Sequence, residues 1–215
     1  PTRPLSGCVE PSMLAKDCFS AVCTVGFVPY KGFFDPDEAR KARDRLERAG
    51  LDAELRPASA FSTLGWFNDP LLSTTLRADS ADLVNTVIHE LVHNTFYARG
   101  GAVFNESFAN FVGARGAERF FRARGDTANL RRTIDDWTYE RRRGDFYTRL
   151  YRALDSAFAA HPGDSLGRVR AAADVYATYR TRLVRALGPP GLSPDSVEAW
   201  AARVRLNNAI LIARP

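Results

Sequence analysis

Two histidines and a glutamate near the middle of the chain have the spacing of a hydrolytic metal site. His89 and His93 are four residues apart, so on a helix they lie on one face, one turn from each other. Two imidazoles held in this way can bind one metal ion, and Glu90 beside them can orient and deprotonate a metal-bound water. The pattern H-E-x-x-H therefore indicates metal-assisted hydrolysis. The alternative is a helix that carries two polar histidines by chance.

A tetrahedral zinc site that catalyses hydrolysis needs a third protein ligand and leaves its fourth position to water. Glu106 is the next candidate, because Gly100 and Gly101 predict a chain reversal between the histidines and this carboxylate. Asn105 is the predicted N-cap of the second helix, and the resulting hairpin would return Glu106 to the two histidines. The alternative role of Glu106 is that of a first-turn carboxylate that interacts with the helix dipole.

Asn110 lies one turn after Glu106 on the same predicted helix face. Its side chain could accept a hydrogen bond from a ligand imidazole and fix the tautomer of that ring. The alternative, an asparagine that only packs or caps, is at least as well supported by the sequence.

These motifs resemble those of the glutamate-ligand zinc peptidases, and N-E-S-F-A at 105–109 is similar to the N-E-x-x-A motif of the zinc aminopeptidases. The short separation between His93 and Glu106 is similar to that in a bacterial family described as putative aminopeptidases. Three further segments resemble that family: V-P-Y-K-G-F-F at 28–34, S-T-L-G-W-F-N-D-P-L-L-S-T at 62–74 and L-N-N-A at 206–209. The resemblance extends in order from about residue 18 to residue 209.

The resemblance implies an α+β, zincin-like fold that is mostly helical, with a small β-sheet whose edge strand precedes the H-E-x-x-H helix. It implies one zinc ion held by His89, His93 and Glu106, with Glu90 as the general base. The expected function is peptide-bond hydrolysis by an aminopeptidase that removes N-terminal residues. The alternatives are a zinc endopeptidase of the same chemistry and a non-catalytic module that holds a metal or binds a partner through a basic surface. The resemblance also favours the bacterial cell envelope, periplasmic or lipid-anchored, over the cytoplasm.

Hydrolysis also requires a donor for the tetrahedral oxyanion, and an aminopeptidase requires an acid for the substrate ammonium. A tyrosine or arginine that follows Glu106 is the expected donor, and Asp69 is the candidate acid. The candidate tyrosines are Tyr139, Tyr147, Tyr151, Tyr176 and Tyr179. His161 lies in a His-Pro-Gly-Asp turn and is expected at the surface, not at the metal.

The chain of 215 residues is long enough to form one domain with a sizeable core. We expect a single zinc peptidase domain with four parts: an N-terminal extension (1–17), a small sheet unit (18–78), the zinc-site helical hairpin (79–124) and a C-terminal helical part (125–215). Strands are predicted at 21–29, 51–56 and 71–76. By the resemblance, residues 71–75 pair with the substrate backbone, and an internal strand is the alternative.

Helices are predicted where caps and apolar periodicity coincide. The expected helices are 36–48, the H-E-x-x-H helix that begins behind a cap at Asp79 or Ser80, 106–124, 126–160, 165–187, and a last helix from 194 whose apolar end is 206–212. The arginines at 141–143 and Gly144 are expected to interrupt the fourth of these helices.

The net charge of +5 comes from 27 arginines and three lysines against 25 acidic residues. Arginines crowd residues 115–152, but aspartates and glutamates are interleaved with them, which favours ion pairs on exposed helices over a surface that binds nucleic acid. No apolar run approaches the roughly 20 residues of a membrane helix, so no integral membrane segment is expected. A peptide is the expected partner, and the sequence does not determine the oligomeric state.

Overall fold

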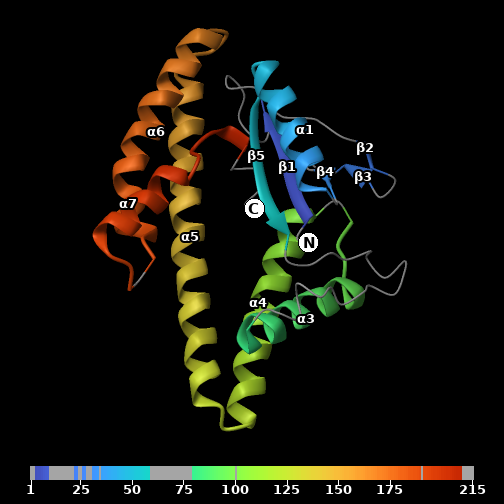
Figure 1. The fold of residues 1–215 in the computed structure, drawn as a ribbon. Coiled ribbons are helices and arrows are strands. Elements are labelled where there is room, and N and C mark those ends of the chain that lie inside the picture. The colour runs from blue at the N-terminus through green and yellow to red at the C-terminus, as the bar shows by residue number, and fades with distance from the viewer. Residues whose placement is uncertain are drawn as a thin grey trace. The chain divides into compact units, whose positions relative to one another are not determined.

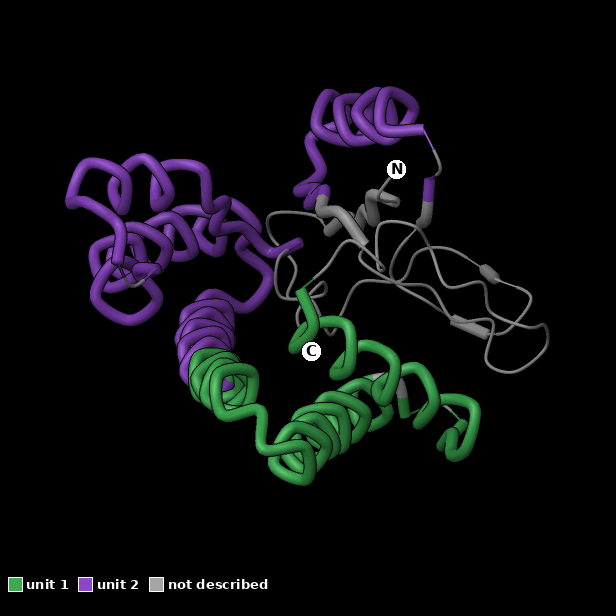
Figure 2. Tube along the Cα trace, turned by 60° about the horizontal axis from the view of Figure 1, so that its bottom comes forward, with its two compact units in different colours: residues 1–3, 57–140, 215 green, residues 4–56, 141–214 purple. Residues whose placement is uncertain are grey.

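The computed structural model describes residues 3–9, 22–23, 26–27, 31–33, 35–58, 79–99, 101–189 and 191–209. Over these residues the chain is mostly helical, as the sequence predicted (Figure 1). Two compact units are distinguished in Figure 2: unit 1 comprises residues 1–3, 57–140 and 215, and unit 2 comprises residues 4–56 and 141–214. The helix α5 (Thr127–Ala159) contributes residues to both units.

Unit 2 contains the strands. β1 (Arg3–Val9) lies between β4 (Lys31–Gly32) and β5 (Asp52–Ala58) in a three-stranded sheet, and it pairs antiparallel with β4. The predicted strand at 51–56 is therefore confirmed as β5. The single strand predicted at 21–29 is wrong, because β2 (Val22–Cys23) and β3 (Gly26–Phe27) pair with each other antiparallel. Gly26 lies within that stretch, and a glycine weakens a continuous strand.

The helix α1 (Pro36–Arg48) begins where the sequence predicted, with Asp35 as its N-cap and proline at its first position. The Asp35 carboxylate accepts a hydrogen bond from the Asp37 backbone N–H at 2.8 Å. Ala39 and Ala42 are buried against Phe33 and Leu55, so this helix packs on β5 through its smallest side chains.

The remainder of unit 2 is helical and contains its main core. The second half of α5 packs with α6 (Ser165–Leu187) and α7 (Pro194–Arg203) around the fully buried Leu150, Leu154 and Leu183. The expected interruption of α5 at 141–144 is wrong, since α5 is continuous there. The last helix ends at Arg203, so the expectation that its apolar end extends to 206–212 is also wrong for residues 206 and 207, which are not helical.

Asn208, which is completely buried, joins three segments of unit 2. Its side-chain oxygen accepts a hydrogen bond from the Tyr176 hydroxyl on α6, and its backbone N–H donates to the Asp52 carboxylate of β5 at 3.2 Å. Burial raises the pKa of Asp52, and the hydrogen bond from Asn208 partly offsets that effect. The L-N-N-A segment at 206–209 is thus anchored within unit 2.

Unit 1 contains α3 (Ser80–Thr95), α4 (Ala102–Ala123) and the first part of α5. Ala81 of α3 and Ala117 and Phe121 of α4 form its apolar core, and Leu130 of α5 packs against them. Arg132 of α5 forms an ion pair with Asp79, the residue that caps α3, at 2.5 Å. Ile134 of α5 is 40% exposed, although its place in the apolar pattern of residues 126–160 predicts a core position. Among the described residues, the structure contains no helix long and apolar enough to cross a membrane.

Candidate metal centre

The helix α3 carries His89, Glu90 and His93, and its start is fixed at Asp79. The Asp79 carboxylate accepts hydrogen bonds from the backbone N–H groups of Ala81 and Asp82 at 2.9 and 3.1 Å. Two of the N–H groups that have no partner within the helix are satisfied in this way. The ion pair between Asp79 and Arg132 attaches this end of α3 to α5.

The helix α4 begins four residues earlier than the sequence predicted. Its N-cap is Gly101, which makes no side-chain capping bond, so the prediction of Asn105 as the N-cap is wrong. The Asn105 side chain is instead 2% exposed, accepts a hydrogen bond from the Ala98 N–H at 2.9 Å and donates to the Ala98 carbonyl at 2.8 Å. Asn105 therefore fixes the loop that connects the two helices of the hairpin.

We expect Asn105→Ala to lower the free energy of unfolding by about 1–3 kcal/mol, because it leaves the N–H and carbonyl of Ala98 without their partner. Metal affinity should fall as well, since the loop determines how α4 returns to α3. Chemical unfolding and metal titration measure the two effects. Ser107→Ala, an exposed change two residues further along α4, is the control and should stay within about 0.5 kcal/mol of the parent. A stability equal to that of the control would contradict the role of Asn105.

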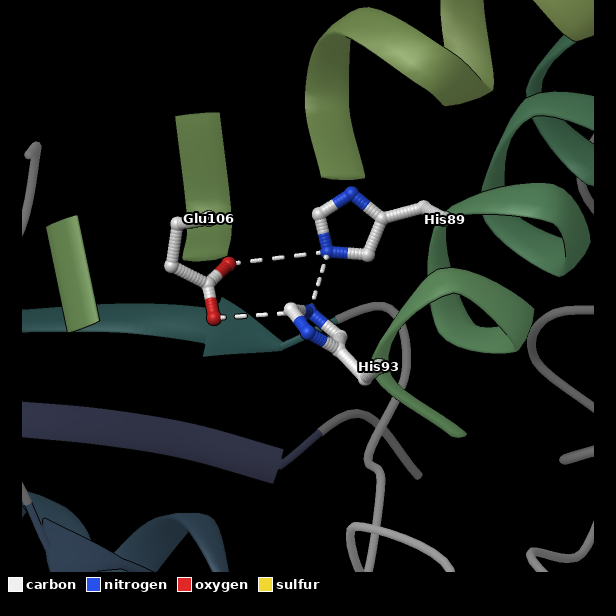
Figure 3. Close-up of side chains that lie close together, drawn as sticks. All are labelled: His89, His93 and Glu106. Carbon is white, nitrogen blue, oxygen red and sulfur yellow. Dashed lines mark hydrogen bonds and ion pairs between the residues drawn. The ribbon is translucent and has the colours of Figure 1, made fainter. Parts of the chain in front are cut away.

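The hairpin brings His89, His93 and Glu106 together, as Figure 3 shows. The two Nε2 atoms are 3.1 Å apart, and the Glu106 carboxylate directs one oxygen to each ring, with both Nε2–oxygen distances equal to 3.5 Å. Zinc bonds of about 2.0–2.2 Å in a regular tetrahedron give ligand–ligand distances of about 3.3–3.6 Å. These three residues could therefore hold a metal ion without rearrangement of the helices.

The family model described as "Putative aminopeptidase" matches residues 9–214, nearly the whole chain. The chain belongs to this family. The comparisons with curated proteins and with solved structures found no significant match to this chain. Membership in an aminopeptidase family supports a peptidase that acts on peptide substrates.

The alternative role of Glu106, a carboxylate at the positive end of a helix, fits this aminopeptidase-family hairpin less well. Because α4 begins at Ala102, Glu106 lies in the second turn, and the first turn of α4 contains no acidic residue. The helix dipole acts mainly within the first turn. The position of Glu106 is better accounted for by its contacts with the two imidazoles.

The two rings differ in how their surroundings affect protonation. Burial lowers the pKa of His89, but the hydrogen bond with Glu106 and the charges of Glu90 and Glu106 outweigh it and raise the pKa above its usual value. Burial also lowers the pKa of His93, which stays below its usual value despite Glu106. The Nδ1 atom of His93 is buried and has no hydrogen-bond partner among the described residues. The pKa values of the two rings are therefore shifted in opposite directions.

Glu90 and Asn110 both lie next to His89. Glu90 is partly buried, and its charge raises the pKa of His89. Asn110 lies close enough to His89 for its side chain to raise the pKa of that ring, so it is the neighbour that the spacing of Glu106 and Asn110 suggested. A side chain in this position has the means to orient the imidazole.

The other residues that the sequence singled out are not part of the group of three metal-binding candidates or lie outside the described part of the chain. Asp69 and the predicted strand at 71–76 lie outside the described residues. Of the candidate tyrosines, Tyr139 is in unit 1 with the metal centre, and Tyr147 and Tyr179 are buried in the core of unit 2. His161 closes its turn through a contact between Nδ1 and the Ala157 carbonyl at 2.9 Å.

The sequence did not reveal that Asn105 bridges the loop between α3 and α4. An asparagine at this position is equally typical of a helix N-cap and of a side chain that forms hydrogen bonds with a loop backbone.

Proposed function

We propose that this chain is a zinc-dependent aminopeptidase whose active site is centred on His89, His93 and Glu106. The observation that carries the proposal is the convergence of two imidazoles and one carboxylate from two helices, in a member of an aminopeptidase family. Three protein ligands are typical of catalytic zinc, whereas structural zinc is usually bound by four. The proposal includes a zincin-like fold and a bacterial cell-envelope location, both of which stay predictions.

The chemistry of the donors favours zinc among the biological metals. Imidazole nitrogens suit zinc, whereas magnesium and calcium prefer a shell composed of oxygen atoms. Both rings offer Nε2 to the same point, and the neutral form that binds metal is favoured at the buried His93. The Glu106 carboxylate supplies the negative charge that a divalent ion requires.

Each residue of the site has one role in the proposed reaction. His89, His93 and Glu106 would hold the ion, which when bound would polarise the scissile carbonyl and lower the pKa of the attacking water. Glu90 accepts the proton of the attacking water on its carboxylate and delivers it to the leaving amine. Asn110 keeps the His89 ring in a fixed orientation.

Two other functions are compatible with the same residues. A zinc endopeptidase would use identical chemistry, because the H-E-x-x-H motif and its third ligand do not encode the position of cleavage. A non-catalytic metal module would need no general base, so the partly buried Glu90 beside His89 argues against it. Family membership favours the aminopeptidase over both.

A pair of fluorogenic substrates separates these functions. The two carry the same amino acid, one with a free amine and one with an acetylated amine, and both are given to the zinc-loaded protein. We expect cleavage of the free amine only, because an aminopeptidase must recognise the substrate ammonium. Equal cleavage of both would replace the aminopeptidase with an endopeptidase, and binding of zinc without any cleavage would favour the non-catalytic module.

A further inference from the structure

The face of α4 that packs against α3 is lined by small residues. Ala109, Gly113 and Ala117 are spaced by four and are all buried. Ala117 packs with Ala81 near the start of α3, and Gly113 lies against Asn85, one turn further along α3. The two helices therefore run antiparallel, and the next turn of contact is the one that contains His89 and Glu106.

At Gly113 the space between the two helices does not accommodate a side chain. A Cβ atom placed on Gly113 would overlap Asn85 Oδ1 and would lie 3.0 Å from the Asn85 backbone carbonyl oxygen. It would also lie 3.5 Å from the Cβ atom of His89. The Asn85 side chain could rotate away, but its backbone carbonyl belongs to α3 and moves only with the helix.

A displacement at this contact would be transmitted to the metal ligands. Asn85 is four residues from His89, a distance of about 6 Å along the helix axis. Glu106 lies on the opposing helix, two turns before Gly113. Metal sites tolerate ligand displacements of only about 0.2 Å. Separation of the helices at Gly113 would therefore lengthen the distances between the Glu106 carboxylate and both imidazoles.

We propose that Gly113 is a positioning residue of the metal centre: its lack of a side chain sets the approach of α4 to α3 and with it the separation of Glu106 from the two histidines. The proposal rests on the proposed role of Glu106 as a ligand. It assigns to Gly113 no contact with metal or substrate.

Two other glycines in helices provide matched comparisons. The nearest atoms to a Cβ atom at Gly116 all belong to the side chain of Ile88, with Cδ1 at 2.8 Å and Cγ2 at 3.1 Å, so the contact is with a side chain and not with the backbone of α3. A Cβ atom at Gly144, in the middle of α5, would meet nothing within 4 Å. All three glycine-to-alanine changes raise helix propensity equally, so differences among them report the local contact.

The test measures zinc affinity by chelator competition for the parent, Gly113→Ala, Gly116→Ala and Gly144→Ala, each shown by circular dichroism to be folded without metal. We expect Gly113→Ala to bind zinc at least about tenfold more weakly than the parent. Mutation of residues that orient metal ligands reduces metal affinity by a similar factor. Gly144→Ala should match the parent, and Gly116→Ala should lie between them. The visible spectrum of the cobalt-loaded protein should change for Gly113→Ala only, because it reports coordination geometry and not stability.

If Gly113→Ala does not fold, the effect of Gly113→Ala is measured in an Asn85→Ala background instead. The double variant Gly113→Ala/Asn85→Ala lacks the overlapping side-chain oxygen but retains the backbone contact, so it should bind zinc more weakly than Asn85→Ala alone. Equal affinity of these two, or parental affinity and an unchanged cobalt spectrum for a folded Gly113→Ala, would overturn the proposal for Gly113. A parent protein that binds no zinc would overturn the proposed function, and the inference with it.

Discussion

Replacement of Glu90 with glutamine is expected to abolish nearly all peptide hydrolysis while zinc binding is retained. The amide has the size of the carboxylate but cannot accept the proton of the attacking water. General bases contribute about a hundred- to ten-thousand-fold to such reactions, so kcat should fall within that range. Because Glu90 is not among the three residues that converge on the metal position, the zinc content should remain near one ion per chain.

The control for this variant is Asp82→Asn, which makes the same chemical change on an exposed side chain two turns earlier on α3. Its kcat should stay within about twofold of the parent, because the exposed ion pair of Asp82 with Arg132 lies two turns from the metal centre and such pairs contribute little to stability. Glu90 also raises the pKa of His89 through its charge, so the comparison should be made at a pH where the parent is saturated with zinc. Retained hydrolysis by a zinc-loaded Glu90→Gln protein would remove Glu90 from the mechanism.

Replacement of Glu106 with alanine is expected to lower zinc affinity by more than about a hundredfold, since even residues that only orient ligands cost ten- to a hundredfold. The carboxylate is the only acidic member of the three-residue group, and it contacts both imidazoles at 3.5 Å. Its removal leaves two neutral donors for a divalent ion. Hydrolysis should disappear at low zinc and recover only in part at high zinc.

Glu106→Gln distinguishes a ligand from a residue that stabilises the helix. The amide keeps the size and polarity of the side chain but binds zinc poorly, so it should resemble alanine in zinc affinity. Both Glu106 variants should fold as well as Ser107→Ala, because the Glu106 side chain is 44% exposed and lies beyond the first turn of α4. Full zinc retention by Glu106→Ala would show that the third ligand comes from elsewhere in the chain.

The parts of the fold that the sequence predicted best are those with local chemical signals. Asp35 followed by proline, Asp79 before an apolar periodic run, and glycine at residues 50 and 125 gave both limits of α1, the start of α3 and the end of α4 to within one residue. The positive φ angles of both glycines explain why the helices end there. Arg132 and Asp136, four residues apart on α5 and both exposed, form an ion pair of the kind that the interleaved charges predicted.

The parts that the sequence did not predict depend on contacts between distant segments. Asparagine is a common N-cap residue, but the side chain of Asn105 instead forms hydrogen bonds with the N–H and the carbonyl of Ala98. This contact is visible only in the folded loop. Gly113 and Gly116 were not distinguished from any other helical glycine, because their importance arises from Asn85 and Ile88 on the neighbouring helix. The pairing of β2 with β3 likewise depends on long-range register.

The candidate site itself was largely predictable, for a physical reason. A metal site requires few residue types at fixed spacing, so His89, His93 and Glu106 stand out in a chain with only three histidines. Their convergence depends on the loop and on the helix crossing, which the sequence indicated only through Gly100 and Gly101. Roles that involve the substrate, such as the oxyanion donor, leave no comparable pattern because many tyrosines and arginines qualify.

The central claim is that hydrolysis requires one zinc ion at His89, His93 and Glu106. The most direct measurement strips the protein of metal with a chelator, titrates zinc back, and follows cleavage of a substrate with a free N-terminal amine. We expect no cleavage without metal, recovery that reaches its maximum at one zinc ion per chain, and no recovery for Glu106→Ala at that same stoichiometry. Cleavage that survives complete removal of the metal, or that recovers equally in Glu106→Ala, would contradict this claim.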